Sequence, residues 1–203
     1  MQTIKYIWRL MQAVFGLALL ALGLAMLIAA EGPDPWGVFL LGLQRFLPLT
    51  LGVVAQIGGL GLIILNVVWG RRMPGLATVM SMLLVGWFLD LFLARGIAPE
   101  PASLPVQILV LASGILIFST GIVTYVRAGL GEGPVEAMMF VLSKRLKLPV
   151  GRAKVLQDCM FVVGGLFLGT PLRLGTLITA FSVGPVTGWL LDVFERRSNV
   201  KSG

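Results

Sequence analysis

Long apolar runs separated by short polar stretches follow one another along the whole 203-residue chain. A helix needs about 20 apolar residues to cross roughly 30 Å of hydrocarbon. Runs that approach or reach this length predict six transmembrane helices, at residues 8–29, 51–69, 76–94, 106–126, 155–170 and 174–194. The pattern therefore predicts an all-α, polytopic membrane protein with a single membrane domain over residues 1–203.

Several short motifs occur twice, about 100 residues apart, which is the signature of an internal repeat. The recurring pairs are WFLDLF (87–92) with WLLDVF (189–194), FLPLTLG (46–52) with RLKLPVG (145–151), and GLAMLIAAEGPDP (23–35) with GIVTYVRAGLGEGP (121–134). These recurrences favour a true repeat over chance similarity between apolar segments. One copy covers about 8–95 and the other about 105–196.

Each copy of the repeat holds three predicted spans. Because three is odd, the second copy must enter the membrane in the opposite sense to the first. We therefore expect two inverted three-helix repeats, an arrangement that many secondary transporters use to build a binding site near the membrane midplane.

A short helix is predicted after the first span of each copy, starting at Pro35 and at Pro134. Proline at the first helical position pre-sets the backbone angle without losing a needed donor. Each segment of about 13 residues would be roughly 20 Å long, too short to span. Two placements stay open. The helix is either re-entrant, with its amino end facing a ligand inside the protein, or flat at the membrane interface.

Charge indicates how the spans are oriented. The net charge is +7. With both termini in the cytoplasm, all of the 16 Lys and Arg residues except Arg45, Arg95 and Arg173 fall on the cytoplasmic side. This bias predicts an N-in, C-in orientation, with the positive charge facing anionic lipid rather than nucleic acid.

Composition removes several classes of chemistry. The chain has no His and only one Cys, Cys159, which leaves no imidazole metal ligand and no Ser-His or Cys-His catalytic pair. The glycines of RAGLGEGP (127–134) are not followed by the Lys-Ser/Thr of a phosphate-binding loop. We expect no enzyme activity, no metal and no cofactor.

Polar side chains inside membrane spans are costly and point to function. Gln56 lies in the second span, and Gln157 and Asp158 lie in the corresponding fifth span. We expect these three side chains to face a central cavity and bind a polar substrate or coupling ion. Asp158 has an alternative role as the partner of Lys154 in a surface ion pair at i, i+4. The other predicted substrate-binding residues are Gly129, Gly131 and Gly133 of the bend and Thr176 of the last span.

Further features of the spans have structural explanations. Asn66, Thr78 and Ser81 add an amide and hydroxyls, and Asp90 and Asp192 occupy matched places suited to helix-end anchors. Small-residue stripes include Gly165-x-x-x-Gly169 and Ala180-x-x-x-Gly184-x-x-x-Gly188, which allow close helix packing or a homodimer face. Gly184-Pro185 should kink the sixth span.

A family resemblance rests on the second half of the chain. GLGEGP (129–134), LSKRLKLPVG (142–151) and LGTLITAFSVGP (174–185) resemble the YczE/YyaS/YitT-type bacterial membrane proteins. The resemblance implies a bacterial inner-membrane protein of five or six spans. It implies no catalytic residues, and export of small molecules is one function suggested for such proteins.

Two functions follow as expectations. The first is a small transporter or permease, including an exporter, that moves a small polar or amphipathic molecule through a midplane site. The alternative is a non-transporting membrane partner that stabilises or localises another protein.

Overall fold

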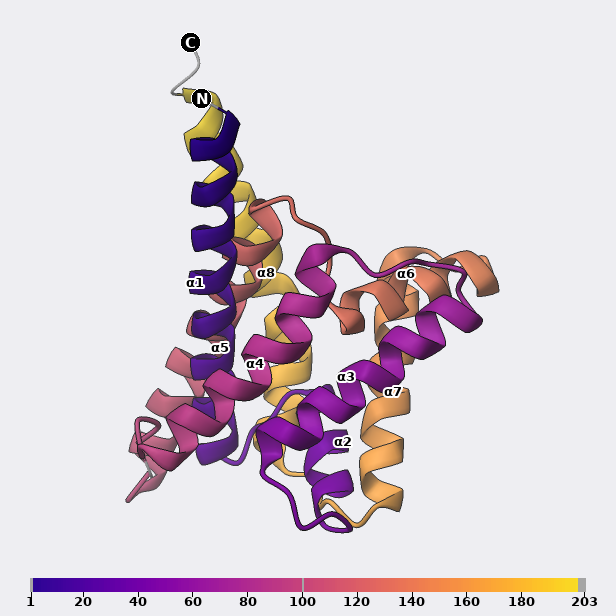
Figure 1. Ribbon diagram of the computed structural model, residues 1–203. Coiled ribbons are helices and arrows are strands. Elements are labelled where there is room, and N and C mark those ends of the chain that lie inside the picture. Colours follow the sequence, from indigo (N-terminus) through magenta and orange to yellow (C-terminus); the bar gives the residue numbers. More distant parts are fainter. Residues whose placement is uncertain (1, 100, 201–203) are drawn as a thin grey trace.

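The computed structural model of the protein describes residues 2–99 and 101–200, with side chains described as far as residue 194. The described chain is entirely helical, with no strand. Its eight helices are α1 (Gln2–Ala29), α2 (Pro35–Gln44), α3 (Leu51–Val68), α4 (Leu76–Ala94), α5 (Leu104–Arg127), α6 (Pro134–Leu146), α7 (Val150–Phe167) and α8 (Leu174–Val200) (Figure 1).

Five of these helices are long and apolar enough to cross a membrane: α1, α3, α4, α5 and α8. The all-α, membrane-spanning class predicted from the sequence is therefore confirmed. The fifth predicted span, residues 155–170, lies on α7 and is not among these helices. Its 18 residues include Arg152, Lys154 and Asp158, more charge than an ordinary span carries.

The centre of the fold is an antiparallel pair formed by α1 and α5 (Figure 1). Glycines let the two backbones touch. A Cβ on Gly16 would lie 2.5 Å from the backbone nitrogen of Tyr125, and one on Gly23 would collide with the backbone of Phe118. Gly121 makes the same close approach to Leu20. This is the small-residue packing by which membrane helices associate closely.

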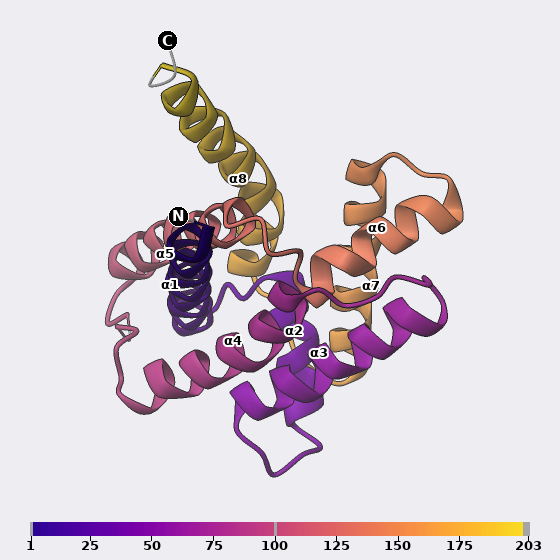
Figure 2. The same cartoon turned by 45° about the horizontal axis from the view of Figure 1, so that its top comes forward.

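The remaining helices surround this pair in matched ways. α4 packs on α1 and α8 packs on α5, while α2 packs on α7 and α6 packs on α3. α2 also contacts α3 as α6 contacts α7, and α2 touches α8 as α6 touches α4. Figure 2 shows α8 extending away from the rest of the molecule at its carboxyl end. Each of these contacts is therefore matched by one between the corresponding helices of the other half of the chain.

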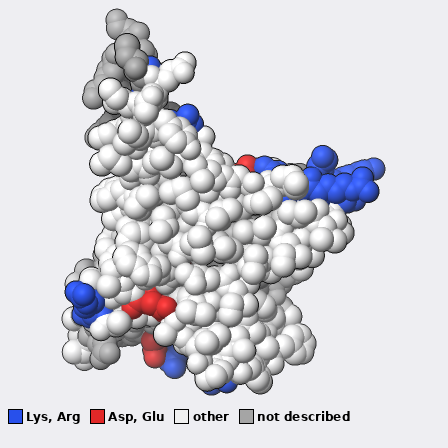
Figure 3. Space-filling model, in the orientation of Figure 1, with Lys and Arg blue, Asp and Glu red and all other residues white. Residues whose placement is uncertain are grey.

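The two short helices begin at the predicted prolines. Pro35 opens α2, whose Asp34 cap accepts a hydrogen bond from the Gly37 backbone nitrogen at 3.1 Å. Pro134 opens α6. Lys147, the residue directly after this helix, has a left-handed conformation (φ 54°) that ends it. α2 is wedged between α3 and α7, whereas α6 exposes a basic carboxyl end, visible as the blue surface on the right of Figure 3.

The predicted charge asymmetry can be followed only in part. Arg145 at the end of α6 donates to the Trp69 carbonyl at the end of α3. Arg45 after α2 donates in the same way to the Gly169 carbonyl after α7. The beginning of α1 and the end of α8 lie at the same end of the molecule (Figure 1). Three cations predicted for the cytoplasmic side, Arg196, Arg197 and Lys201, lie outside the described side chains.

Candidate binding site at the start of the second short helix

The glycine-rich bend before α6 is held against the first turn of α4. The backbone nitrogen of Ala77 donates to the Leu130 carbonyl at 3.1 Å, and the Thr78 hydroxyl donates to the Glu132 carbonyl at 2.7 Å. A Cβ on Gly75 would lie 3.8 Å from the Gly131 Cα, so the two glycines nearly touch. Gly131 has φ +116°, a conformation that only glycine adopts without strain.

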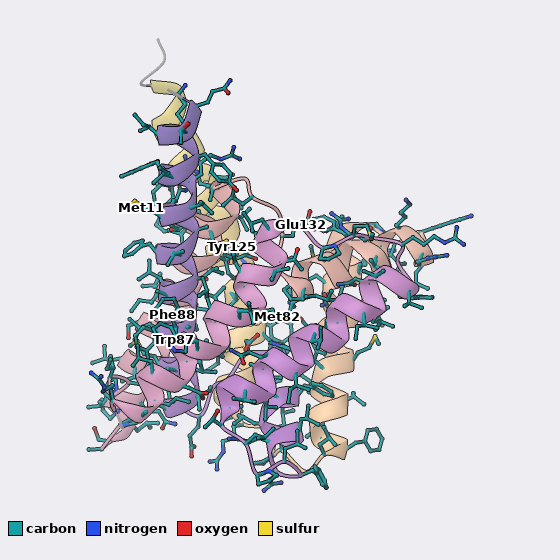
Figure 4. All side chains as sticks on the ribbon, in the orientation of Figure 1. Met11, Met82, Trp87, Phe88, Tyr125 and Glu132 are labelled. Carbon is teal, nitrogen blue, oxygen red and sulfur yellow. The ribbon has the colours of Figure 1, made fainter. Side chains whose placement is uncertain are left out.

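A pocket of about 170 Å³ opens beside this bend. Its polar lining comes from Asn66 of α3, Arg72 after α3, Thr78 of α4 and Glu132 of the bend. The remaining lining residues are Ile63, Met73, Pro74, Gly75, Gly131 and Ala137. Figure 4 marks the bend at Glu132, where α4 and α6 start close together. The pocket thus combines a few polar groups with apolar walls, as small-molecule sites do.

Two buried amides bind the first turn of α6 and leave an oxygen free. Asn66 is 3% exposed, and its Nδ2 donates to the Pro134 carbonyl at 3.0 Å. Gln157 is 1% exposed, and its Nε2 donates to the Val135 carbonyl at 2.8 Å. Within the described structure, Asn66 Oδ1 and Gln157 Oε1 have no hydrogen-bond donor. An unpaired buried acceptor costs about 1–3 kcal/mol, so both oxygens favour a donor such as an N–H or O–H group.

An ion pair borders the pocket. Arg72 Nη2 lies 2.6 Å from Glu132 Oε1 and 2.7 Å from Oε2. Both side chains are partly exposed, and the Arg72 guanidinium also lies 5.0 Å from the centre of the Phe140 ring. Such an exposed pair contributes little stability, about 0–1 kcal/mol. Breaking this ion pair therefore costs little stability.

The amino end of α6 is already matched by a carboxylate of the protein. A Cβ placed on Gly133 would collide with Glu136 Oε2. The same Cβ would lie 3.2 Å from the Ser81 hydroxyl and 3.2 Å from the Tyr125 hydroxyl. Burial raises the pKa of the Glu136 carboxyl, while its own backbone N–H and the Tyr125 hydroxyl act in the opposite direction. Because Glu136 occupies the positive end of the helix, an anionic ligand gains little there.

The bend before α2 repeats this construction at the other end of the α1–α5 pair. Arg173 lies 2.6 Å from Glu31, as Arg72 does from Glu132. The Thr179 hydroxyl donates to the Gly32 carbonyl at 2.8 Å, and a Cβ on Gly175 would lie 2.8 Å from the Gly32 Cα. Asp34 takes the place at the start of α2, and burial raises its pKa to about 6 despite the opposing charge of Lys154.

The structure brings some of the predicted site residues together and separates others. Gly131 lines the pocket, Gly133 lies beside Glu136, and Gln157 binds the first turn of α6. Gly129 is exposed, and its carbonyl accepts from Arg9 at 2.5 Å. Thr176 is buried next to the opposite bend, one residue after Gly175.

The other two predicted side chains have structural partners. Gln56 Nε2 donates to the Leu83 carbonyl at 2.9 Å, which ties α3 to α4. Asp158 pairs with Lys154, the alternative that the i, i+4 spacing left open. The glycine stripes divide as well: Gly165 packs on the Val38 backbone inside the molecule, whereas a Cβ placed on Gly184 or Gly188 meets no other element within 4 Å in the described part of the chain.

Sequence reasoning gave too little weight to Asn66, Arg72 and Glu132. Asn66 was a usable signal, because it is an amide late in an otherwise apolar span. Arg72 and Glu132 carry no local signal, since 60 residues separate them. Among the described residues, no three His, Cys, Asp or Glu side chains gather as a metal site would require.

The fold and its polar bends define a class, that of the small polytopic helical membrane proteins. The chain belongs to the "Family of unknown function (DUF6198)", whose model matches residues 7–192. The resemblance seen in the sequence is thereby confirmed for the YczE and YyaS branches. No solved structure matches the chain.

Relatives are similar to this chain over most of their length. The "Uncharacterized membrane protein YczE" of Bacillus subtilis (strain 168) is 28% identical over 171 residues, covering 83% of this chain and 79% of its own. An "Uncharacterized protein" of Haemophilus influenzae is 23% identical and covers 92% and 85%. The "Uncharacterized protein YyaS" of Bacillus subtilis is 22% identical and covers 89% and 91%.

Proposed function

We propose that the protein is a small transporter of the bacterial inner membrane. In this proposal two inverted halves, each of three crossings and one short helix, bind a small polar molecule where the halves meet, and both termini face the cytoplasm. Export is the direction that the family resemblance suggests. The observation that carries the proposal is the pocket beside Gly131, which is lined in part by Asn66, a buried amide whose Oδ1 has no hydrogen-bond partner in the described structure.

The pairing of contacts between the halves supports the inverted arrangement. Each bend is held by a threonine hydroxyl on its carbonyl and by an arginine on its glutamate: Thr78 and Arg72 at one bend, Thr179 and Arg173 at the other. The matched residues lie about 100 positions apart, the spacing of the sequence repeat. Two like bends at opposite ends of an antiparallel pair provide one gate for each side of the membrane.

The chemistry of the pocket limits what it binds. Its volume of about 170 Å³ is below the roughly 300–1,000 Å³ of sites for drug-sized ligands. Asn66 Oδ1 is a free acceptor for a donor on the bound molecule. The Glu132 carboxylate favours a positively charged group on that molecule, and Arg72 offers N–H donors to a carboxylate or hydroxyl. A compact solute with an N–H or O–H donor fits this set better than a large lipid-like molecule.

Transport can be tested without knowing the substrate. Purified protein is reconstituted in liposomes loaded with a bacterial small-molecule extract, and the released solutes are identified by mass spectrometry. We expect at least one polar solute to leave liposomes with the wild type and to be retained with Asn66→Leu. Gly61→Ala is the matched control on the same helix, because its new Cβ meets nothing within 4 Å.

The same experiment addresses the alternative function. If no solute in the extract distinguishes wild-type liposomes from protein-free ones, the transporter proposal is wrong and the role of a membrane partner for another protein gains weight. A homodimer through the glycine-rich helix faces stays a prediction, and the result of this experiment does not depend on it.

A further inference from the structure

One contact in the first half of the chain lacks its counterpart in the second half. Where α3 begins, Gly52 packs directly on Gly86 of α4, backbone against backbone. Asp90 of α4 then caps α3: its carboxylate accepts from the Gly52 backbone nitrogen at 2.7 Å and from the Thr50 hydroxyl at 2.5 Å. Together these contacts close α4 on α3 at one end of the molecule.

The residues for an equivalent contact are present in the second half. WLLDVF supplies Asp192 as WFLDLF supplies Asp90, and Gly188 precedes it as Gly86 precedes Asp90. Gly151 near the start of α7 corresponds to Gly52. Among the residues that the structure describes, however, no atom of another element lies within 4 Å of a Cβ placed on Gly151 or Gly188.

The polar part of the contact is missing as well. Pro149, at the cap position of α7, makes no side-chain capping bond, so the first N–H groups of α7 lack the carboxylate that α3 has. The Asp192 side chain is exposed, and none of the hydrogen bonds among the side chains that the structure describes, which end at residue 194, involves it. Only a small share of the spanning part of α8 is buried, and α8 stands apart from α7 (Figure 2).

α8 also contains an internal proline, which α4 lacks. Gly184 and Pro185 lie inside α8, where proline removes one helical hydrogen bond. On the amino-terminal side of this point, the Thr179 hydroxyl fixes α8 to the bend before α2 by its hydrogen bond to the Gly32 carbonyl. On the carboxyl side, the contact found at its end is the Arg127 guanidinium over the Phe194 ring at 5.1 Å.

We propose that the carboxyl-terminal part of α8 closes on α7 in a second conformation. In that state Gly188 packs on Gly151, Asp192 caps the first turn of α7, and the Arg127–Phe194 contact breaks. The movement pivots at Gly184–Pro185. It covers the end of the molecule at which α7 begins and α8 ends, which is also the end where α1 begins (Figure 1).

This inference rests on the proposed transport function and supplies its conformational step. The α3–α4 contact closes one end in the present structure, and the α7–α8 contact closes the other end in the second state. Inverted repeats that exchange their conformations in this way give alternating access to one site. The closed contact of the first half serves as the template for the closed contact of the second.

The test is a disulfide between Gly151→Cys and Gly188→Cys in a Cys159→Ala background. Both positions have open space, so the cysteines should not disturb folding. A disulfide requires Cβ atoms about 3.5–4.5 Å apart, and only the closed state brings these two that near. The control pairs Gly151→Cys with Gly184→Cys, which lies at the pivot itself, one turn before Gly188, and has equally open surroundings among the described residues.

We expect copper-phenanthroline oxidation in membranes to link 151 to 188 within one chain at least about fivefold faster than 151 to 184, since geometry sets disulfide formation. Adding Asp192→Ala should slow the 151–188 link severalfold. Equal rates for the two pairs, or links found only between two chains, overturn the proposal. The readout is independent of flux. A fast link with no solute released would leave the closure standing and count against transport alone.

Discussion

Gly16 of α1 lies directly against Tyr125 of α5, with space for no side chain: a Cβ there would be 2.5 Å from the Tyr125 backbone nitrogen. At the counterpart position, Gly114 of α5, a Cβ would lie 3.2 Å from the Leu27 side chain of α1, a looser contact. The two helices also meet backbone against backbone at Gly23 and at its counterpart Gly121, so the halves share tight glycine contacts made in opposite directions. This central pair positions the two bends at its two ends.

Gly16→Ala is predicted to push α1 and α5 apart. Overpacking of a tight contact costs about 1–3 kcal/mol, and here the obstacle is backbone, which cannot rotate away. The expected result is a lower midpoint of thermal unfolding in detergent. Gly61→Ala, on the open face of α3, is the control and should leave the midpoint unchanged or slightly raised. Equal midpoints for both variants would contradict the tight packing of α1 on α5.

Asp90→Ala is predicted to loosen α3 from α4. It removes the acceptor of the Gly52 and Thr50 hydrogen bonds and leaves Thr50 as the remaining side-chain cap of α3 among the described residues. Loss of such a cap costs about 0.5–2 kcal/mol. Asp192→Ala is the matched control, because Asp192 makes no hydrogen bond in the described structure. The measurement is the free energy of unfolding of the two variants by denaturant. A larger loss of stability in Asp192→Ala than in Asp90→Ala would contradict the difference between the α3–α4 and α7–α8 contacts.

The sequence predicted most of the helices because apolar length and proline position act locally. The starts of α2 and α6 were placed correctly at Pro35 and Pro134. The boundaries of the long helices were less predictable. α1 starts at Gln2, before the predicted span at 8–29, because a helix continues past the bilayer where nothing breaks it. α7 ends at Phe167, and it carries more charged residues than an ordinary membrane span.

Charge reversal is predicted to expose the role of the Arg72–Glu132 pair. Arg72→Glu places two acidic groups side by side at the pocket and should reduce solute release from liposomes by about tenfold, the effect of roughly 1.4 kcal/mol. Adding Glu132→Arg restores the opposite charges and should recover most of the release. Stability should change by less than about 1 kcal/mol in both, as for exposed pairs. A double variant as impaired as the single one would show that the pairing itself is not what matters.

Stability is predicted to depend on pH through Asp34. Its pKa is raised from 3.8 to about 6 by burial, so between these values the folded protein holds a proton that the unfolded chain releases. Stability therefore falls as the pH rises through this window, by up to about 1.4 kcal/mol per pH unit from this group. Asp34→Asn keeps a capping side chain without the titration.

The measurement is the unfolding midpoint of wild type and Asp34→Asn from pH 4 to pH 7. The variant should show the shallower decline, with Glu136 supplying what slope remains, because burial raises its pKa as well. Parallel curves would show that Asp34 is ionised throughout and that its burial has no such effect.

The site was harder to predict than the helices because its contacts join distant parts of the chain. Glycines at 131 and 133 could be chosen from the bend alone, and both lie at the site. Gln56 looked equally suitable, but its amide is used to join α3 to α4. Asp158 sits one turn from Lys154, and this local pairing outweighed a role in the cavity.

The opposed orientation of the two halves can be measured directly at matched positions where the short helices end. Phe46 and Leu146 are both exposed and follow the arginines that bind Gly169 and Trp69. Each is changed to cysteine in a Cys159→Ala background, and intact spheroplasts are treated with a membrane-impermeant maleimide. Two inverted halves predict labelling of Phe46→Cys from outside and of Leu146→Cys only after permeabilisation. Labelling of both positions from the same side would contradict the account.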